Sequence, residues 1–141
     1  MKRSAATDKL RTLLGPIAAL VLRIAVGWVF LRHGIAKVGM GVAGVTGFFH
    51  SLGIPYPHVF AIVVMVVETV GAGCVAIGVL TRFWAACMVV DMIAAIHLAI
   101  MPTGRPFELE GLLGAAALAL VALGAGPLSV GRLLSRKPAA K

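Results

Sequence analysis

Charged residues are scarce in this chain of 141 residues: they make up 13% of it, and only five are acidic. A soluble globular domain has about 25% charged residues. Hydrophobic residues fill 60% of the chain and the mean hydropathy is +1.03, which is more apolar surface than a domain of this size can bury. The composition therefore excludes a soluble domain and predicts a single integral membrane domain.

Cysteine is rare as well. Cys74 and Cys87 both lie in apolar runs and form no CxxC, so we expect buried thiols without chemistry. His33, His50 and His58 are near one another in the sequence, but their spacing matches no zinc or copper pattern, and we predict no metal site. The chain also lacks a nucleophile triad, a phosphate loop, a haem-attachment CxxCH and a Rossmann glycine pattern.

The net charge of +8 does not indicate a nucleic-acid partner, because the basic residues do not form a stripe with aromatic residues between them. They sit at the ends of apolar runs, where anchors to a lipid bilayer are found. The N-terminus, the turn at Arg82 and the C-terminal tail together hold nine Lys and Arg; the opposite side holds Arg32, Lys37 and Arg105, which is three. Both termini are therefore predicted to be cytoplasmic, in a multi-pass protein of the cell membrane.

Four apolar stretches dominate the chain. We expect spanning helices at about Leu13–Leu31, Val59–Leu80, Phe83–Met101 and Glu108–Leu123. Each approaches the roughly 20 residues needed to cross the hydrocarbon layer, the last being the shortest. Because little chain separates the second stretch from the third, these two helices should be antiparallel neighbours.

The connection from about His33 to His58 is rich in glycine but still apolar. Within it, Val42–Leu52 is predicted to form a short interfacial helix with Phe48, Phe49 and Leu52 on one side, ended by Gly53. The predicted fold is all-α: a polytopic membrane four-helix bundle with this interfacial helix between the first and second spans. We expect a basic cytoplasmic segment over residues 1–12, the transmembrane domain over 13–127 and a basic cytoplasmic tail over 128–141.

Three of the spans carry an ionisable residue: Arg23, Glu68 and Asp91. A charge at a helix centre costs about 2.5–3.5 kcal/mol on insertion scales. Counted from the predicted cytoplasmic ends, the three lie at depths of about 15, 18 and 12 Å, so they should meet in one layer. Two interpretations remain open: a buried ion-pair triad that fixes helix register, or a polar pocket in which Arg23 orients a ligand and an acid exchanges protons.

Three further polar residues allow two interpretations each. His97, in the outer half of the third span, is either hydrogen-bonded to a neighbouring helix or serves as a proton relay or donor to a quinone carbonyl. Glu108 and Glu110 begin the fourth helix, where a positive helix terminus favours acids. Alternatively, they close the mouth of a site by pairing with Arg32, Lys37 or Arg105.

Several motifs follow one another in a distinctive order. They are Arg23, Gly27, Phe30-Leu31-Arg32-His33-Gly34 and Lys37; Phe48-Phe49 and Leu52-Gly53-Ile54-Pro55; Glu68, Gly71, Gly78 and Leu80-Thr81-Arg82; and Gly124-Ala125-Gly126-Pro127-Leu128-Ser129. From about Leu22 to Ser129 this order resembles the DoxX family of small membrane proteins. Val130 and Gly131 stand where that family suggests Leu-Asp, so any role of that acid is absent here.

The resemblance implies a four-helix membrane protein connected with redox work. Members of the family include small subunits of thiosulfate:quinone oxidoreductases, proteins of quinone or catechol stress, and a mycobacterial complex with superoxide dismutase and a sulfurtransferase. A quinone or a soluble redox enzyme is therefore the implied neighbour, and a homo-oligomer is left open. The resemblance does not decide whether the chain is itself catalytic.

The functional hypothesis is a small subunit of a membrane redox assembly with a quinone-like polar site inside the membrane. Glu68 and Asp91 would handle protons as the catalytic pair, and Arg23, Glu68, Asp91 and His97 would bind the ligand. No cofactor of the chain's own is identified, and quinone is the candidate ligand. The alternative is a non-catalytic anchor or scaffold that recruits soluble redox enzymes. A proton path is a third and weaker option, because four helices of this length enclose little lumen.

Overall fold

The computed structural model of the protein describes the backbone of residues 5–135 and the side chains of residues 12–134. This part of the chain is entirely helical, without strands. Several basic residues on which the predicted cytoplasmic ends depend lie outside the described side chains, namely Lys2, Arg3, Lys9, Arg11, Arg136, Lys137 and Lys141. The assignment of segments 1–12 and 128–141 to the cytoplasm stays a prediction.

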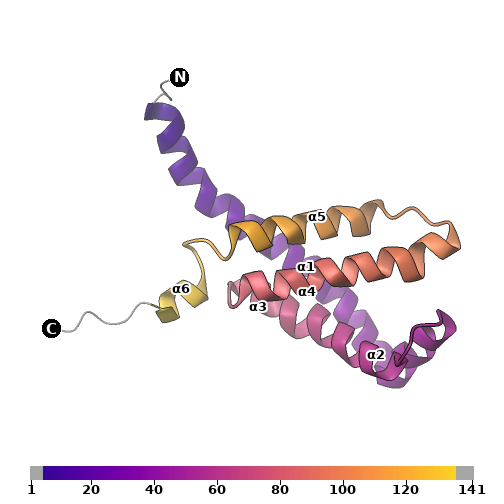
Figure 1. Cartoon of the computed structure of the whole chain (residues 1–141). Helices are drawn as coiled ribbons and strands as arrows, with labels where there is room; N and C mark the ends of the chain where they lie inside the picture. Colours follow the sequence, from indigo (N-terminus) through magenta and orange to yellow (C-terminus); the bar gives the residue numbers. More distant parts are fainter. Residues whose placement is uncertain (1–4, 136–141) are drawn as a thin grey trace.

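The first helix, α1, is much longer than the sequence suggested. It covers Ala5–Ser51, interrupted only at Gly41, whose φ of 72° and ψ of 161° bend the chain. Such angles are accessible almost only to glycine. The predicted end at Leu31 is therefore wrong, whereas the separate short helix expected after residue 41 is present. Figure 1 shows the N-terminal part of α1 extending beyond the other helices.

The remaining helices follow the second, third and fourth predicted spans closely, apart from α6, which lies in the predicted cytoplasmic tail. They are α2 (Pro57–Val66), η1 (Val67–Gly71), α3 (Ala72–Ile77), α4 (Thr81–Ala94), η2 (Ala95–Ile100), η3 (Met101–Thr103), α5 (Glu108–Leu123) and α6 (Val130–Ser135). Segments α2, η1 and α3 form one continuous rod, and α4 continues into η2 and η3. The turns η1 and η2 are π-helical, a distortion that is frequent at functional sites.

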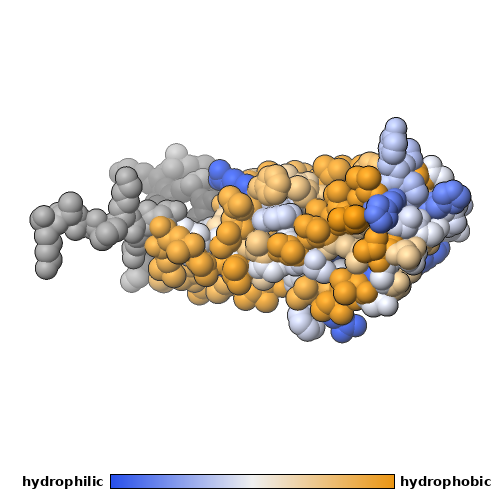
Figure 2. Space-filling view, turned by 90° about the horizontal axis from the view of Figure 1, so that it is seen from below, coloured by the Kyte–Doolittle hydropathy of each residue, from blue (hydrophilic) through white to orange (hydrophobic). Residues whose placement is uncertain are grey.

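Within the described residues, three helical segments are long and apolar enough to cross a membrane: Thr12–Ser51, Pro57–Ile77 and Thr81–Thr103. At 1.5 Å per residue the second is about 31 Å long, which matches a hydrocarbon layer of about 30 Å. Helix α5, with 16 residues, is only about 24 Å long. The surface over the middle of the molecule is largely apolar (Figure 2), and many large hydrophobic side chains on it are exposed, as contact with lipid requires.

The helices pack side by side around a shared apolar core. Helix α5 runs along α4, and α1 packs on α2, η1 and α3 (Figure 1). Val26 and Phe30 of α1, Met88 of α4 and Leu120 of α5 are almost completely buried in this core. A second, smaller cluster lies beyond the bend at Gly41.

That second cluster explains where the short helix after Gly41 goes. Val45 and Phe49 are buried against Ala61 of α2. Of the aromatic residues predicted to share one side, Phe48 is instead 46% exposed. The short helix thus packs against α2, and its placement at a membrane interface stays a prediction.

Helix α1 approaches the second rod closely at two glycines seven residues apart. A Cβ atom added to Gly27 would lie 2.8 Å from the carbonyl oxygen of Ala72, and one added to Gly34 would lie 2.6 Å from that of Glu68. Small residues permit such backbone contact between membrane helices. Glu68 therefore lies directly against α1.

Candidate functional site: a polar cluster between the helices

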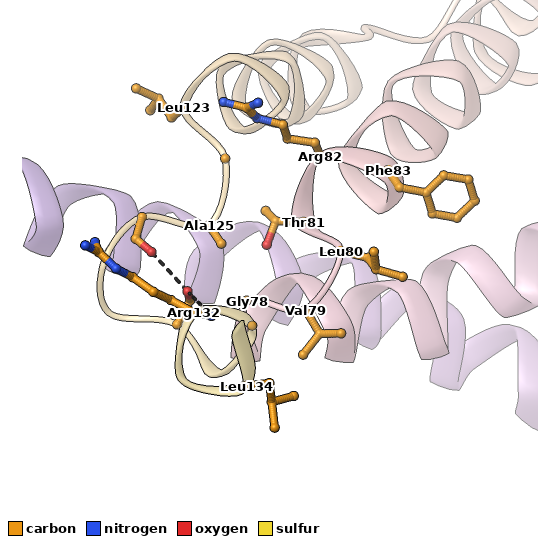
Figure 3. Close-up of a pocket in the computed structure, with 14 residues that line it drawn as sticks. Gly78, Val79, Leu80, Thr81, Arg82, Phe83, Leu123, Ala125, Arg132 and Leu134 are labelled. Carbon is orange, nitrogen blue, oxygen red and sulfur yellow. Dashed lines mark hydrogen bonds between the residues drawn. The ribbon is translucent and has the colours of Figure 1, made fainter. Parts of the chain in front are cut away.

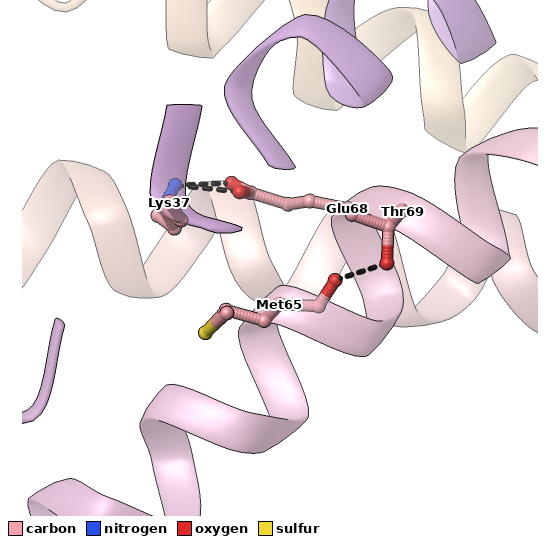
Figure 4. A network of polar contacts seen from close by, with 4 residues as sticks. All are labelled: Lys37, Met65, Glu68 and Thr69. Atoms are coloured by element: carbon pink, nitrogen blue, oxygen red, sulfur yellow. Dashed lines mark hydrogen bonds and ion pairs between the residues drawn. The ribbon is translucent and has the colours of Figure 1, made fainter. Parts of the chain in front are cut away.

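The strongest polar contact between the described helices joins α1 to η1. The ammonium group of Lys37 donates to both carboxylate oxygens of Glu68, at 2.7 Å to Oε1 and 2.6 Å to Oε2 (Figure 4). The Glu68 side chain is 4% exposed and that of Lys37 22%. A nearly buried charge needs such a partner, because an unpaired ion in an apolar interior is costly.

The local structure explains why these two groups meet. Because α1 continues past residue 31, Lys37 belongs to the same helical face as Phe30 and Gly34, with spacings of four and three residues. On the other helix, Glu68 is the second residue of the π-helical turn η1. The neighbouring hydroxyl of Thr69 donates to the Met65 carbonyl oxygen at 2.6 Å (Figure 4), a local bond that tends to bend a helix.

Asp91 of α4 brings a third charged group to the cluster. Its carboxyl group is near enough to Glu68 and Lys37 to interact electrostatically with both. Its Oδ2 atom is buried and has no hydrogen-bond partner among the described residues. The cluster thus contains one cation and two carboxyl groups, contributed by three separate helices.

A small cavity of about 80 Å³ opens on the Lys37 and Glu68 side of this cluster, and Asp91 does not line it. Phe30, His33, Lys37, Glu68, Met92, Ala95, Leu109, Glu110 and Leu113 line it. A water molecule needs at least about 10–15 Å³ of such space, so several waters or a small polar group fit. Among the polar residues at its wall, Glu110 comes from the first turn of α5, so one of the two acids considered for the mouth of a site lines the same cavity as Lys37.

Arg23 does not join Glu68 and Asp91, and the predicted meeting of the three is wrong. Its guanidinium group donates to the carbonyl oxygens of Ala125 and Leu128, the latter at 2.6 Å, in the α5–α6 loop. The side chain is 1% exposed. The predicted depth of Arg23 is wrong because α1 begins well beyond the ends of the other helices. Counting from residue 13 therefore places Arg23 too deep in the membrane.

His97 bonds no neighbouring helix among the described residues, so the first interpretation of it is wrong. It is exposed, and its Nδ1 bonds the carbonyl oxygen of Ile93 at 2.9 Å, one turn back in its own helix. Neither His97 nor Arg23 lines the cavity, whereas Lys37 and His33, which the glycine-rich sequence predicts to lie in a connection between spans, do. If α1 is continuous, Arg23, Gly34 and Lys37 lie on one helical face. This spacing could have identified Lys37 as a residue of the site.

Comparison with known proteins places the chain among small membrane proteins. A family model described as DoxX matches residues 18–101. The chain is 36% identical over 100 residues to "Uncharacterized membrane protein Rv3486" of Mycobacterium tuberculosis, an alignment that covers 71% of the chain and 61% of that protein. It is 34% identical over 80 residues to "Putative oxidoreductase CatD" of Bacillus subtilis, covering 57% and 58%.

A third relative is "Inner membrane protein YphA" of Escherichia coli, 37% identical over 67 residues, which cover 48% of the chain and 47% of that protein. The chain thus aligns with about half to three fifths of the length of these relatives. No solved structure matches. The matched region includes Lys37, Glu68 and Asp91.

Proposed function

The chain belongs to the DoxX family, and from this premise we propose that it is a small subunit of a membrane redox assembly with a quinone-like site inside the membrane. One of its relatives carries an oxidoreductase name. The observation that carries the proposal is the Lys37–Glu68–Asp91 cluster beside a cavity. Buried ionisable groups in membrane spans are rare and are commonly functional.

In this proposal a carbonyl oxygen of a quinone ring reaches the cavity, and the cluster exchanges protons with it. Lys37 supplies a cationic donor, and His33 lines the same cavity. With both carboxyl groups ionised, Lys37, Glu68 and Asp91 sum to a charge of −1, and one bound proton makes the cluster neutral. Reduction of a quinone consumes two protons and two electrons; the carboxyl groups relay the two protons one at a time, each replaced from water, and a soluble partner enzyme supplies the electrons.

The proposed site is a revision of the one expected from sequence. Glu68 and Asp91 keep their proton-handling role, and Lys37 replaces Arg23 as the cation. Arg23 and His97 are left out, since their described partners are carbonyl groups away from the cavity.

We also propose that α5 is a fourth span and completes a membrane four-helix bundle with both termini cytoplasmic. Helix α5 packs along α4, and its polar first turn would sit in the interface. The charge bias supports this orientation more strongly once Lys37 is assigned to the interior. The cytoplasmic side then holds nine Lys and Arg, while Arg32 and Arg105 remain on the other side.

The test uses tryptophan fluorescence in detergent-solubilised protein. Trp84 packs against Gly71 in the turn that carries Glu68, so a Trp28→Phe variant isolates a reporter near the cluster. Titration with a short-chain quinone should quench it saturably, and Glu68→Gln should weaken binding, whereas Glu108→Gln should not. Linear, non-saturable quenching in a folded protein would rule out a bound quinone.

The alternative is a non-catalytic anchor for soluble redox enzymes, in which the cluster only joins helices. The close contact of Gly34 with the Glu68 backbone favours it, because this contact needs no ligand. Copurification from native membranes separates the two proposals. Recovery of the same soluble enzyme with wild type and with a folded Glu68→Gln variant, without any quinone dependence, supports the anchor.

A further inference from the structure

A second cavity, shallow and wide open to the surface, has a volume of about 770 Å³ and lies at the end of the molecule where α3 turns into α4. Its wall is formed by that turn, the first residues of α4, the α5–α6 loop and α6 (Figure 3). It shares no lining residue with the cavity beside Glu68. Its chemistry is therefore independent of the proposed quinone site.

Two arginines on this wall have guanidinium N–H donors without a protein acceptor among the described residues. Arg82 makes one long bond, 3.4 Å from Nη2 to the Ala122 carbonyl oxygen. The guanidinium group of Arg132 has no hydrogen-bond or ion-pair partner among the described residues, and both side chains are exposed. None of the described residues that line the cavity is Asp or Glu. The wall thus carries positive charge without a protein counter-ion.

Thr81 adds a buried polar group that lacks a partner. It is 3% exposed, and its Oγ1 has no hydrogen-bond partner among the described residues. Figure 3 shows Thr81 between Ala125 and Leu80. Most buried hydroxyl groups in proteins are hydrogen-bonded, so an exception at a cavity wall points to a ligand.

Thr81 is also the first residue of α4, a helix of 14 residues. The preceding residue, Leu80, has a left-handed φ of 46° and gives no side-chain cap to the helix. The first N–H groups of a helix have no acceptor within it, and the helix dipole there favours an anion. A hydroxyl, free amide groups and two guanidinium groups together suit a phosphate, which arginine binds with paired hydrogen bonds.

Apart from Ser129, whose hydroxyl donates to the Gly126 carbonyl oxygen, the rest of the wall is apolar, which indicates the kind of molecule that carries the phosphate. Leu80, Phe83 and Leu134 line the cavity and are 68%, 58% and 77% exposed. Helix α4 begins a membrane span at this point, so acyl chains can run along Phe83 into the hydrocarbon layer. We propose that this cavity binds the phosphate headgroup of an anionic phospholipid.

The test is lipid binding by native mass spectrometry of detergent-solubilised protein, with phosphatidylglycerol as the probe. We expect tight binding of one lipid. Arg82→Gln and Arg132→Gln should each weaken it about fivefold, since a basic residue near an anionic headgroup contributes roughly a factor of five. Arg105→Gln is the matched control, because Arg105 is exposed but does not line the cavity.

A second pair of variants tests the buried hydroxyl. Thr81→Val removes it at nearly constant volume and should weaken phosphatidylglycerol binding without lowering the thermal midpoint of the lipid-free protein; Thr81→Ser should bind like wild type. Phosphatidylcholine should bind at least tenfold more weakly. Equal affinity for phosphatidylglycerol in wild type and both arginine variants would overturn the proposal. So would saturation of the site by millimolar sodium phosphate, which would indicate a free anion instead.

Discussion

Lys37 reaches Glu68 across 31 residues of sequence and holds α1 against the π-helical turn of the second rod, with both carboxylate oxygens bonded. The contact combines a buried charge pair with the closest backbone approach at Gly34. Each of these two features stabilises the other, because neither side chain could reach its partner if the helices moved apart.

Removing the cation alone should destabilise the protein. Lys37→Met leaves Glu68 buried without its partner, and breaking such a pair costs about 3–5 kcal/mol; because Lys37 is partly exposed, we expect the lower end. The free energy of unfolding in detergent measures the loss. The double variant Lys37→Met with Glu68→Met should recover most of it. A single variant as stable as wild type would mean that the pair does not form.

The helix contact at Gly34 gives a second prediction. Gly34→Ala places a methyl group 2.6 Å from the Glu68 carbonyl oxygen, so α1 must shift, at a cost of about 1–3 kcal/mol for overpacking. Gly39→Ala is the control, since nothing lies within 4 Å of its added Cβ. That variant should gain about 0.5–1 kcal/mol from helix propensity. Thermal unfolding of both distinguishes packing from propensity, and equal effects would contradict the close approach.

Arg23 should act as a structural anchor. Arg23→Gln removes the charged bonds to the Ala125 and Leu128 carbonyls, each worth about 1.5–3 kcal/mol. We expect faster hydrogen exchange over residues 124–129, while quinone quenching of Trp84 in the Trp28→Phe background stays unchanged. Protection of this loop equal to that in wild type would argue against the anchor.

The bend in α1 depends on one glycine. Gly41→Ala forces a side chain into backbone angles that cost about 1–3 kcal/mol for other residues. Gly47→Ala, where the helix is regular and nothing lies within 4 Å of an added Cβ, should be neutral or stabilising. We expect reduced stability and increased cysteine labelling of a Val45→Cys reporter only in the first variant. If α1 can straighten freely, both variants will behave alike.

The sequence predicted the helices that end at strong local signals. Pro57 begins α2, and Gly124 follows the last residue of α5, close to the expected boundaries. The end of α1 was missed because Gly34 and Gly39 indicate a loop by composition, yet Gly34 is required for close packing and Gly39 is tolerated in the helix. Local propensity does not show which helix a glycine will face.

The candidate site was predicted in part. Glu68 and Asp91 do come together, because they lie near the middle of two antiparallel spans whose ends were correctly placed. Arg23 is the wrong cation because its depth was counted from residue 13, although α1 begins beyond the ends of the other helices. Lys37 could have been found from its spacing to Gly34 and Phe30. The bonds of Arg23 to the α5–α6 loop depend on tertiary packing that no local pattern encodes.

The attachment of Arg23 to the last loop also bears on how the protein is made. Its acceptors lie 102 and 105 residues further along the chain, so α1 emerges from the ribosome and enters the bilayer long before they are synthesised. Until then the guanidinium group must donate its hydrogen bonds to water or to lipid headgroups. The contacts that hold Arg23 therefore form only after the α5–α6 loop has been synthesised, and insertion of α1 alone does not provide them.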